Sequence, residues 1–284
     1  MELNAKLVMS LRDKTTLPMM QCKEALLATK DIVDTEEKWF EAAIEYLRKK
    51  GINTADRFSG RETTSGGIGM SIVSGWRGTI VLLGCQTDFV AKSEIFKDLV
   101  QSISFMYANH DLETDQDNFL IDGKTVSNLL VEKTNQIGEK LSVINKHSIE
   151  VDRFTQDHKV VGYNHDGRIA ALVSGTGDET KLRNVALHIV AANPYPLALN
   201  RDKVDSTLIE KEKSIISSLP DVQSKPEAMK EKIIMGKLGR FFKERVLLEQ
   251  EMLIDGEKKE TVEQYAKRNS LTISNFVRVE VAGT

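Results

Sequence analysis

The sequence predicts an α+β protein built in three parts, and three observations carry that prediction. Apolar side chains recur at helical spacing three times within the first 50 residues. Two later stretches each combine a β-rich hairpin pattern with an amphipathic helix. A proline-marked break then separates two further apolar stripes. We predict boundaries at 1–56, 57–152 and 153–284.

The first 56 residues are predicted to form three short helices. The second helix follows Pro18, and the third ends at Gly51, after basic residues that suit a helix C-terminus. Three such helices resemble a ubiquitin-associated-type domain. Residues 52–67 are rich in Gly, Ser and Thr and are predicted to be a linker. The stripes contain Leu3, Leu7, Val8 and Leu11, then Met19, Met20, Leu26 and Leu27, then Trp39, Phe40, Ala43, Ile44 and Leu47.

An internal repeat organises the rest of the chain. In the first copy, strands at 68–73 and 79–85 flank a turn at 75–78 and precede a helix over 93–109. In the second, strands at 159–163 and 168–174 flank a turn at 164–167 and precede a helix over 179–193. Asp166-Gly167 is a typical hairpin turn. We therefore predict two related α+β subdomains with antiparallel sheets, the second closed by the alternating segment 276–281.

The second subdomain contains an insertion over about 206–246. Apolar residues spaced near seven run to Leu219, and a second stripe resumes after Pro226. Two helices flanking a proline-marked turn predict a protruding antiparallel coiled-coil hairpin.

Composition excludes several classes of function. Lys plus Arg number 39 and Asp plus Glu 42, giving a net charge of -3, so we expect no direct nucleic-acid partner. No apolar stretch approaches the roughly 20 residues of a membrane span, and no signal-peptide core is present at the N-terminus. Cys22 and Cys85 lie far apart in apolar surroundings, which favours free packed thiols and a reducing cytoplasm.

No catalytic or metal-binding set is evident. Gly123-Lys124-Thr125 matches the end of a phosphate-binding loop, but Asn118 replaces the required first glycine and bulky residues follow it. The five histidines lack metal-ligand spacing. We expect neither enzymatic chemistry nor a cofactor.

The most informative segment joins the predicted strand 80–85 to the helix that follows Ser93. It places an acid, Asp88, beside a large aromatic, Phe89. Phe89 could plug the local core while Asp88 caps the helix, or the pair could be offered to another molecule, because such junctions are usually exposed. The pair occurs only in the first copy of the repeat, whereas a purely structural need would be expected in both.

Motifs along the whole chain resemble the bacterial elongation factor Ts family. The most specific is Cys85-Gln86-Thr87-Asp88-Phe89-Val90-Ala91-Lys92. A segment around Lys30 to Glu37 departs from the family pattern as an apparent insertion. Further matches are Leu7-Val8, Leu11-Arg12, Met19-Met20, Cys22-Lys23, Ile137-Gly138-Glu139, Gly162-Tyr163, Gly167-Arg168-Ile169, His188-Ile189, Leu248-Glu249-Gln250 and Phe276-Val277-Arg278.

The resemblance implies a function without bond chemistry. Such a factor binds elongation factor Tu·GDP and promotes GDP release so that GTP can bind. Phe89 is then expected to insert into the Tu nucleotide domain, with Asp88 acting beside it. The predicted contacts are Thr87, Asp88, Phe89, Val90, Arg12, Met19, Met20, Lys23 and His188. The alternatives are an adaptor that binds another protein through the N-terminal helices and the hairpin without exchange activity, and, less favoured, an NTPase.

Overall fold

A computed structural model describes residues 3–15, 17–30, 35–58, 60–109, 125–155 and 157–281. The chain divides into two compact units. Unit 1 comprises Met1–Gly69, Val81–Asn145 and Val281–Thr284, and unit 2 comprises Met70–Ile80 and Lys146–Glu280. Helices and antiparallel strands are both present, as the predicted α+β class requires. The predicted three-part division stays a prediction.

Unit 1 begins with three helices, α1 (Ala5–Thr15), α2 (Met19–Thr29) and α3 (Glu36–Phe58). Their apolar stripes meet in a common core, and the buried Trp39 indole donates a hydrogen bond to the Leu26 carbonyl (2.8 Å). The expected end of the third helix at Gly51 is wrong, because α3 continues to Phe58. An interior glycine costs a helix only about 1 kcal/mol, and no proline follows to stop it.

The first sheet has the order β1-β2-β3, with β1 (Ser65–Val73), β2 (Arg77–Cys85) and β3 (Ser142–Glu150). The β1–β2 turn lies at Ser74-Gly75, both with positive φ, rather than at 75–78 as predicted. After β2 come α4 (Asp88–Lys92), α5 (Glu94–Asn109) and α6 (Val126–Ile137). The inner face of α5 packs on β2 through a core that includes Val81, Leu83 and Phe96.

The second sheet has the order β4-β5-β6 and is antiparallel throughout, with β4 (Lys159–His165), β5 (Ile169–Thr176) and β6 (Thr272–Glu280). Asp166 and Gly167 both have positive φ, so the predicted Asp-Gly hairpin is confirmed. Helices α7 (Glu179–Ala191) and α11 (Val262–Arg268) contribute to the same core as β4 and β5. The predicted closing strand is confirmed, since β6 pairs along β5.

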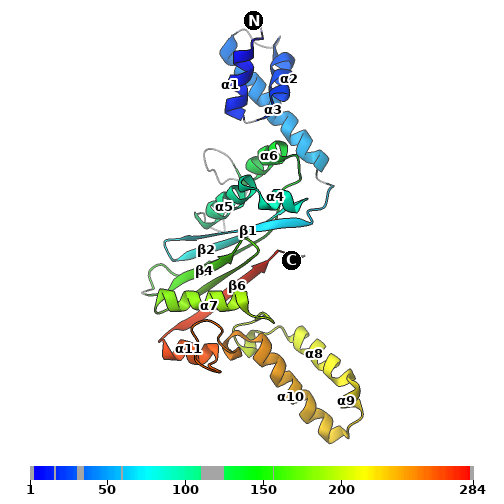
Figure 1. Ribbon diagram of the computed structural model, residues 1–284, viewed down its shortest axis with the longest axis vertical. Coiled ribbons are helices and arrows are strands. Elements are labelled where there is room, and N and C mark those ends of the chain that lie inside the picture. Colours follow the sequence, from blue (N-terminus) through cyan, green and yellow to red (C-terminus); the bar gives the residue numbers. More distant parts are fainter. Residues whose placement is uncertain are drawn as a thin grey trace. The chain divides into compact units, whose positions relative to one another are not determined.

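The segment between α7 and β6 carries α8 (Ser206–Ser218), α9 (Pro220–Gln223) and α10 (Glu227–Arg245). Figure 1 shows α8 and α10 side by side, joined through α9, and the two helices contact each other. At their base, Val204 and Val246 form a small buried cluster with Ala198. Two single turns, η1 (Arg201–Lys203) and η2 (Leu247–Glu249), flank the pair.

Within the described ranges, no helix combines the length and apolarity needed to cross a membrane. Cys22 and Cys85 are both buried free thiols, as the sequence predicts. The segment Gly123-Lys124 lies outside the described residues, and so do residues 31–34 of the apparent insertion.

Candidate functional site

The segment from Thr87 to Ser93 folds as one short helix held at both ends. Thr87 is the N-cap of α4, and its hydroxyl accepts a hydrogen bond from the Val90 backbone N–H (3.3 Å). At the other end, the Ser93 hydroxyl donates to the Val90 carbonyl (2.7 Å) and accepts from the Phe96 N–H (3.3 Å), which opens α5. Ser93 is therefore the helix cap that the sequence predicts.

Glu139 anchors this segment from more than fifty residues away in the sequence. Its carboxylate accepts hydrogen bonds from the backbone N–H groups of Gln86 (3.1 Å) and Thr87 (3.0 Å). The Thr87 hydroxyl donates a third, at 2.7 Å. Hydrogen bonds to a charged acceptor are stronger than neutral ones, so three converging on one carboxylate fix the turn before α4.

The fixed turn presents Phe89 to solvent. Its side chain is 83% exposed. The following residues, Val90 and Ala91, pack instead against the core under α5. The interpretation of Phe89 as a core plug is therefore wrong, because α4 turns Val90 inward and leaves Phe89 outside. A phenylalanine this exposed leaves most of its ring hydrated, so covering it with a partner is favourable.

Asp88 lies next to Phe89 and is also exposed. Lys92, one turn later on α4, donates a hydrogen bond to its Oδ2 (2.8 Å). That hydrogen bond and the Lys92 charge lower the pKa of Asp88, with a further contribution from backbone N–H groups of the first turn. The site therefore offers a carboxylate that stays ionised beside an apolar ring.

Cys85 closes the underside of the turn. Its buried thiol donates to the Thr87 carbonyl (3.2 Å). Burial, followed by the nearby Glu139 charge, raises the pKa of Cys85 to about 11. The thiol is thus protonated at neutral pH and acts as a packed donor, not as a nucleophile.

The N-terminal site residues predicted from the sequence are all exposed. Arg12 lies on α1, and Met19, Met20 and Lys23 lie on α2. Leu27 is also exposed, and at spacing i+7 it lies on the same face of α2 as Met20, two turns further along. Residues 19, 20 and 23 therefore contribute little to the three-helix core, which leaves two flexible apolar side chains and one lysine available to a partner.

His188 occupies a different environment. It is 1% exposed on α7, and its Nδ1 accepts a hydrogen bond from the Leu253 N–H (3.2 Å). Nε2 must then carry the ring proton, which it donates to Gln250 Oε1 (3.1 Å). Burial lowers the pKa of His188, and the Gln250 hydrogen bond opposes that effect. As a partner-binding residue, His188 can act only through the 250–253 surface that it supports.

The structure thus brings Thr87, Asp88, Phe89 and Val90 together on one rigid turn, and it adds Glu139, which sequence reasoning did not assign. The signal for Glu139 was present, since Ile137-Gly138-Glu139 is one of the motifs quoted above. Gly138 supplies the positive φ (81°) that ends α6 and places Glu139 beside the turn. Among the described residues, no group of three His, Cys, Asp or Glu side chains could hold a metal ion.

A fixed turn that carries an exposed ring and a carboxylate is typical of proteins that bind other proteins through a loop on a firm scaffold. The sequence model of the family Elongation factor TS matches residues 86–283. The elongation factor Ts of Paracoccus denitrificans is 34% identical, with 99% of this chain and 93% of that protein covered. Those of Corynebacterium aurimucosum and Deinococcus deserti are each 36% identical over 96% of this chain, covering 96% and 98% of their own lengths. The chain belongs to the elongation factor Ts family of translation elongation factors.

Proposed function

We propose that this chain binds elongation factor Tu·GDP through the turn 87–90 and promotes GDP release so that GTP can bind. The observation that carries the proposal is the 83% exposure of Phe89 on a turn fixed by three hydrogen bonds to Glu139. Because the turn is already fixed before binding, less conformational entropy is lost when the ring contacts the partner.

The energetics limit what Phe89 can do alone. Burying one phenylalanine contributes about 1.5–3 kcal/mol. Each tenfold loss of GDP affinity requires about 1.4 kcal/mol of differential binding. Phe89 can therefore account for a loss of GDP affinity of about tenfold to a hundredfold, and any larger loss needs further contacts. A second exposed surface, formed by Arg12, Met19, Met20 and Lys23, adds affinity for Tu without favouring either nucleotide state.

The proposal includes the domain organisation that the family resemblance implies. Residues 1–56 act as a ubiquitin-associated-like docking domain, and 57–152 as the subdomain that carries the exchange turn. Residues 153–284 form the related second subdomain, with α8 and α10 as its antiparallel coiled-coil hairpin. The contact between these two helices and the shared strand-strand-helix order of both halves support this organisation.

Stopped-flow release of fluorescent GDP from Tu tests the function. Phe89→Ala is expected to lower the stimulated release rate by about one to two decades at subsaturating concentration, from the burial free energy lost. Asp88→Ala is tested separately and in combination. Phe154→Ala is the matched control, because that phenylalanine is 82% exposed and lies outside the turn.

Release that is unchanged in Phe89→Ala, with circular dichroism identical to wild type, contradicts the assigned role of the ring. Binding of Tu that is insensitive to excess GDP, with no stimulated release by the wild-type chain, favours the adaptor function instead.

A further inference from the structure

Strand β6 has one unpaired edge. In the sheet order β4-β5-β6, its only strand neighbour among the described residues is β5. The Phe276 backbone N–H donates to the Asn275 side chain (2.9 Å) rather than to β5, so the amide of Phe276 points to the free edge. In an antiparallel ladder every second residue has this orientation, which places the amide of Arg278 on the same edge.

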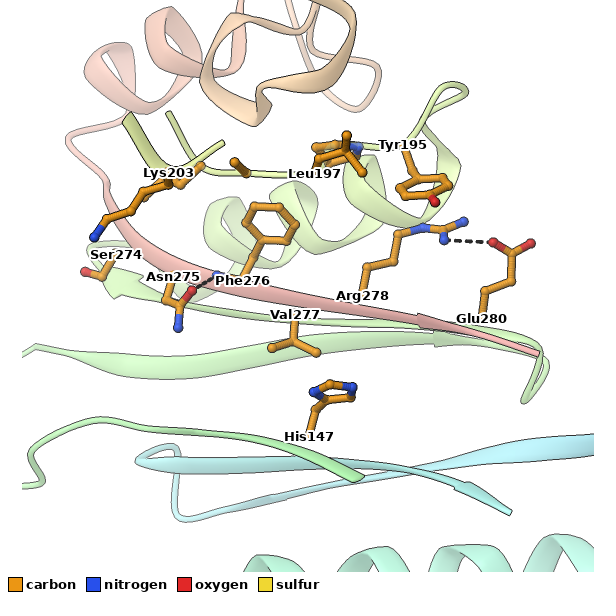
Figure 2. Close-up of a pocket in the computed structure, with 13 residues that line it drawn as sticks. His147, Tyr195, Leu197, Lys203, Ser274, Asn275, Phe276, Val277, Arg278 and Glu280 are labelled. Atoms are coloured by element: carbon orange, nitrogen blue, oxygen red, sulfur yellow. Dashed lines mark hydrogen bonds and ion pairs between the residues drawn. The ribbon is translucent and has the colours of Figure 1, made fainter. Parts of the chain in front are cut away.

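A cavity of about 830 Å³ runs along this edge. Figure 2 shows that Phe276 and Arg278 point toward the segment carrying Tyr195 and Leu197, while Val277 points the other way, toward His147. Both faces of β6 therefore contribute to the lining, as expected where a cavity lies beside a strand edge. Tyr195 and Leu197 are 42% and 38% exposed, so the apolar wall is uncovered.

Arg278 lines this cavity, and one of its hydrogen-bond donors has no acceptor among the residues that the structure describes. Its side chain is 10% exposed, its Nη1 donates to Glu280 (2.8 Å), and its guanidinium lies 4.4 Å from the Tyr195 ring centroid. Its Nε is buried, and no described residue accepts a hydrogen bond from it. A buried donor without an acceptor destabilises the folded chain, and an acceptor that meets it after a small movement of the Arg278 side chain satisfies it.

The charge of the lining favours an acidic occupant. Lys203 and Arg278 are its cations and Glu280 is its only acid. The middle of the cavity is apolar, with Leu197, Phe276 and Val277. A ligand that fits must therefore combine apolar groups with a carboxylate and must satisfy main-chain groups along a strand.

We propose that the β6 edge binds an extended segment of a partner protein that carries an acidic residue with apolar residues two positions before and after it, so that all three side chains lie on one face. The segment adds a strand to β6 through the main-chain groups of Phe276 and Arg278, and it takes the place of the Asn275 side chain at the Phe276 amide. Its carboxylate receives the free Nε–H of Arg278, and its apolar side chains cover Tyr195 and Leu197. Strand addition of this kind takes affinity from main-chain hydrogen bonds and specificity from side-chain pockets.

Fluorescence anisotropy with the full-length chain and no other protein tests the site. The probe is a fluorescein-labelled, C-amidated heptapeptide of alternating Thr and Val with a central Glu, compared with the same peptide carrying Gln. The Glu peptide is expected to bind about tenfold more tightly, and Arg278→Met to remove that difference. Arg240→Met, an exposed arginine on α10, is the matched control and keeps the difference.

Two N-methylated versions of the Glu peptide test strand pairing without altering the protein, and they decide the matter if Arg278→Met does not fold. Methylation of one alternate set of amides is expected to abolish binding, and methylation of the other set to preserve it. Equal binding of both versions, or no saturable binding, overturns the proposal. Complete displacement by sodium acetate reveals a small-anion site, and a free-chain dimer that excludes the peptide in sedimentation reveals a second copy; either overturns it. Because Tu is absent, failure here leaves the exchange function untouched.

Discussion

Glu139 controls the direction in which Phe89 points by holding the residues that precede α4. The carboxylate holds the two amides and the hydroxyl that precede α4. Thr87 then caps α4, and the first turn of that helix projects Phe89 outward while Val90 enters the core. The exposure of the Phe89 ring thus depends on a residue whose own effect is positional.

Glu139→Gln is expected to loosen the turn without unfolding the chain. A glutamine side chain keeps one acceptor oxygen and places an NH₂ group against donors, so at least one hydrogen bond to a charged acceptor is lost, worth about 1.5–3 kcal/mol. Amide hydrogen exchange of Gln86 and Thr87 should accelerate by at least about tenfold. Glu179→Gln, an exposed change in the first turn of α7, is the control. Unchanged protection at both amides contradicts the anchoring role.

His188 predicts a dependence of stability on pH. Its folded-state pKa lies below the ordinary 6.5, because burial disfavours the charged ring and Nδ1 must accept from Leu253. The native state therefore binds fewer protons than the unfolded chain below about pH 6.5, and its stability is full above that value and falls as the pH drops. The slope contributed by one group is at most about 1.4 kcal/mol per pH unit.

Urea unfolding from pH 7.5 to pH 5 measures this slope, and the difference between wild type and His188→Gln isolates it from the other histidines. The variant should be less stable at pH 7.5 and should lose less stability on acidification. Parallel pH profiles for the two proteins would show that His188 does not titrate between the folded and unfolded states.

At the scale of elements, close packing of β1 on α5 depends on one glycine. A Cβ at Gly69 would lie 2.3 Å from the Val100 carbonyl oxygen and 2.7 Å from its carbon, which are backbone atoms that cannot move aside. Gly69→Ala is therefore expected to destabilise the protein by at least about 1–3 kcal/mol, the usual cost of overpacking. Chemical denaturation measures it, with Gly60→Ala as control because nothing lies within 4 Å of that position. Equal midpoints for the two variants would contradict the steric argument.

The elements show where sequence reasoning succeeds. The spacing of apolar residues and the positions of Pro and Gly predict α2 after Pro18, the Asp166-Gly167 hairpin and the closing strand β6. Each of these elements is set by local backbone preferences or by one buried face. They fail for α3, which passes Gly51, and they do not indicate β3, whose mostly half-buried residues lack a clear alternation.

In the candidate site, too, local sequence patterns predict some features and miss others. The residues Thr87 to Val90 could be selected from the motif alone, but no periodicity predicts the exposure of Phe89, because it depends on a five-residue helix after a buried strand. The role of Glu139 rests on hydrogen bonds over a separation of 52 residues, and the burial of His188 rests on Gln250, 62 residues away. Such contacts are products of the tertiary fold and leave no local pattern.

At the scale of the whole molecule, the proposed exchange is a coupling between two binding events and needs no chemical step. A factor that weakens GDP binding to Tu must itself be weakened by GDP to the same extent in free energy. The relation constrains every residue of the interface. A contact that forms equally with both states of Tu adds affinity and contributes nothing to release.

Phe89 is predicted to contribute to the coupling, and the N-terminal helix residues to contribute to affinity alone. Phe89→Ala should therefore reduce two ratios by the same factor, up to one to two decades. The first is the Kd of the chain for GDP-saturated Tu divided by its Kd for nucleotide-free Tu. The second is the Kd of Tu for GDP with the chain bound, divided by the Kd without it. Met20→Ala, which truncates a side chain that is 64% exposed on α2, should weaken binding of the chain to both forms of Tu and leave both ratios unchanged. Calorimetric titrations around the four-state cycle measure all the constants. If Phe89→Ala weakens the two Tu complexes equally, the ring is an anchor and the differential contact must lie elsewhere on the chain.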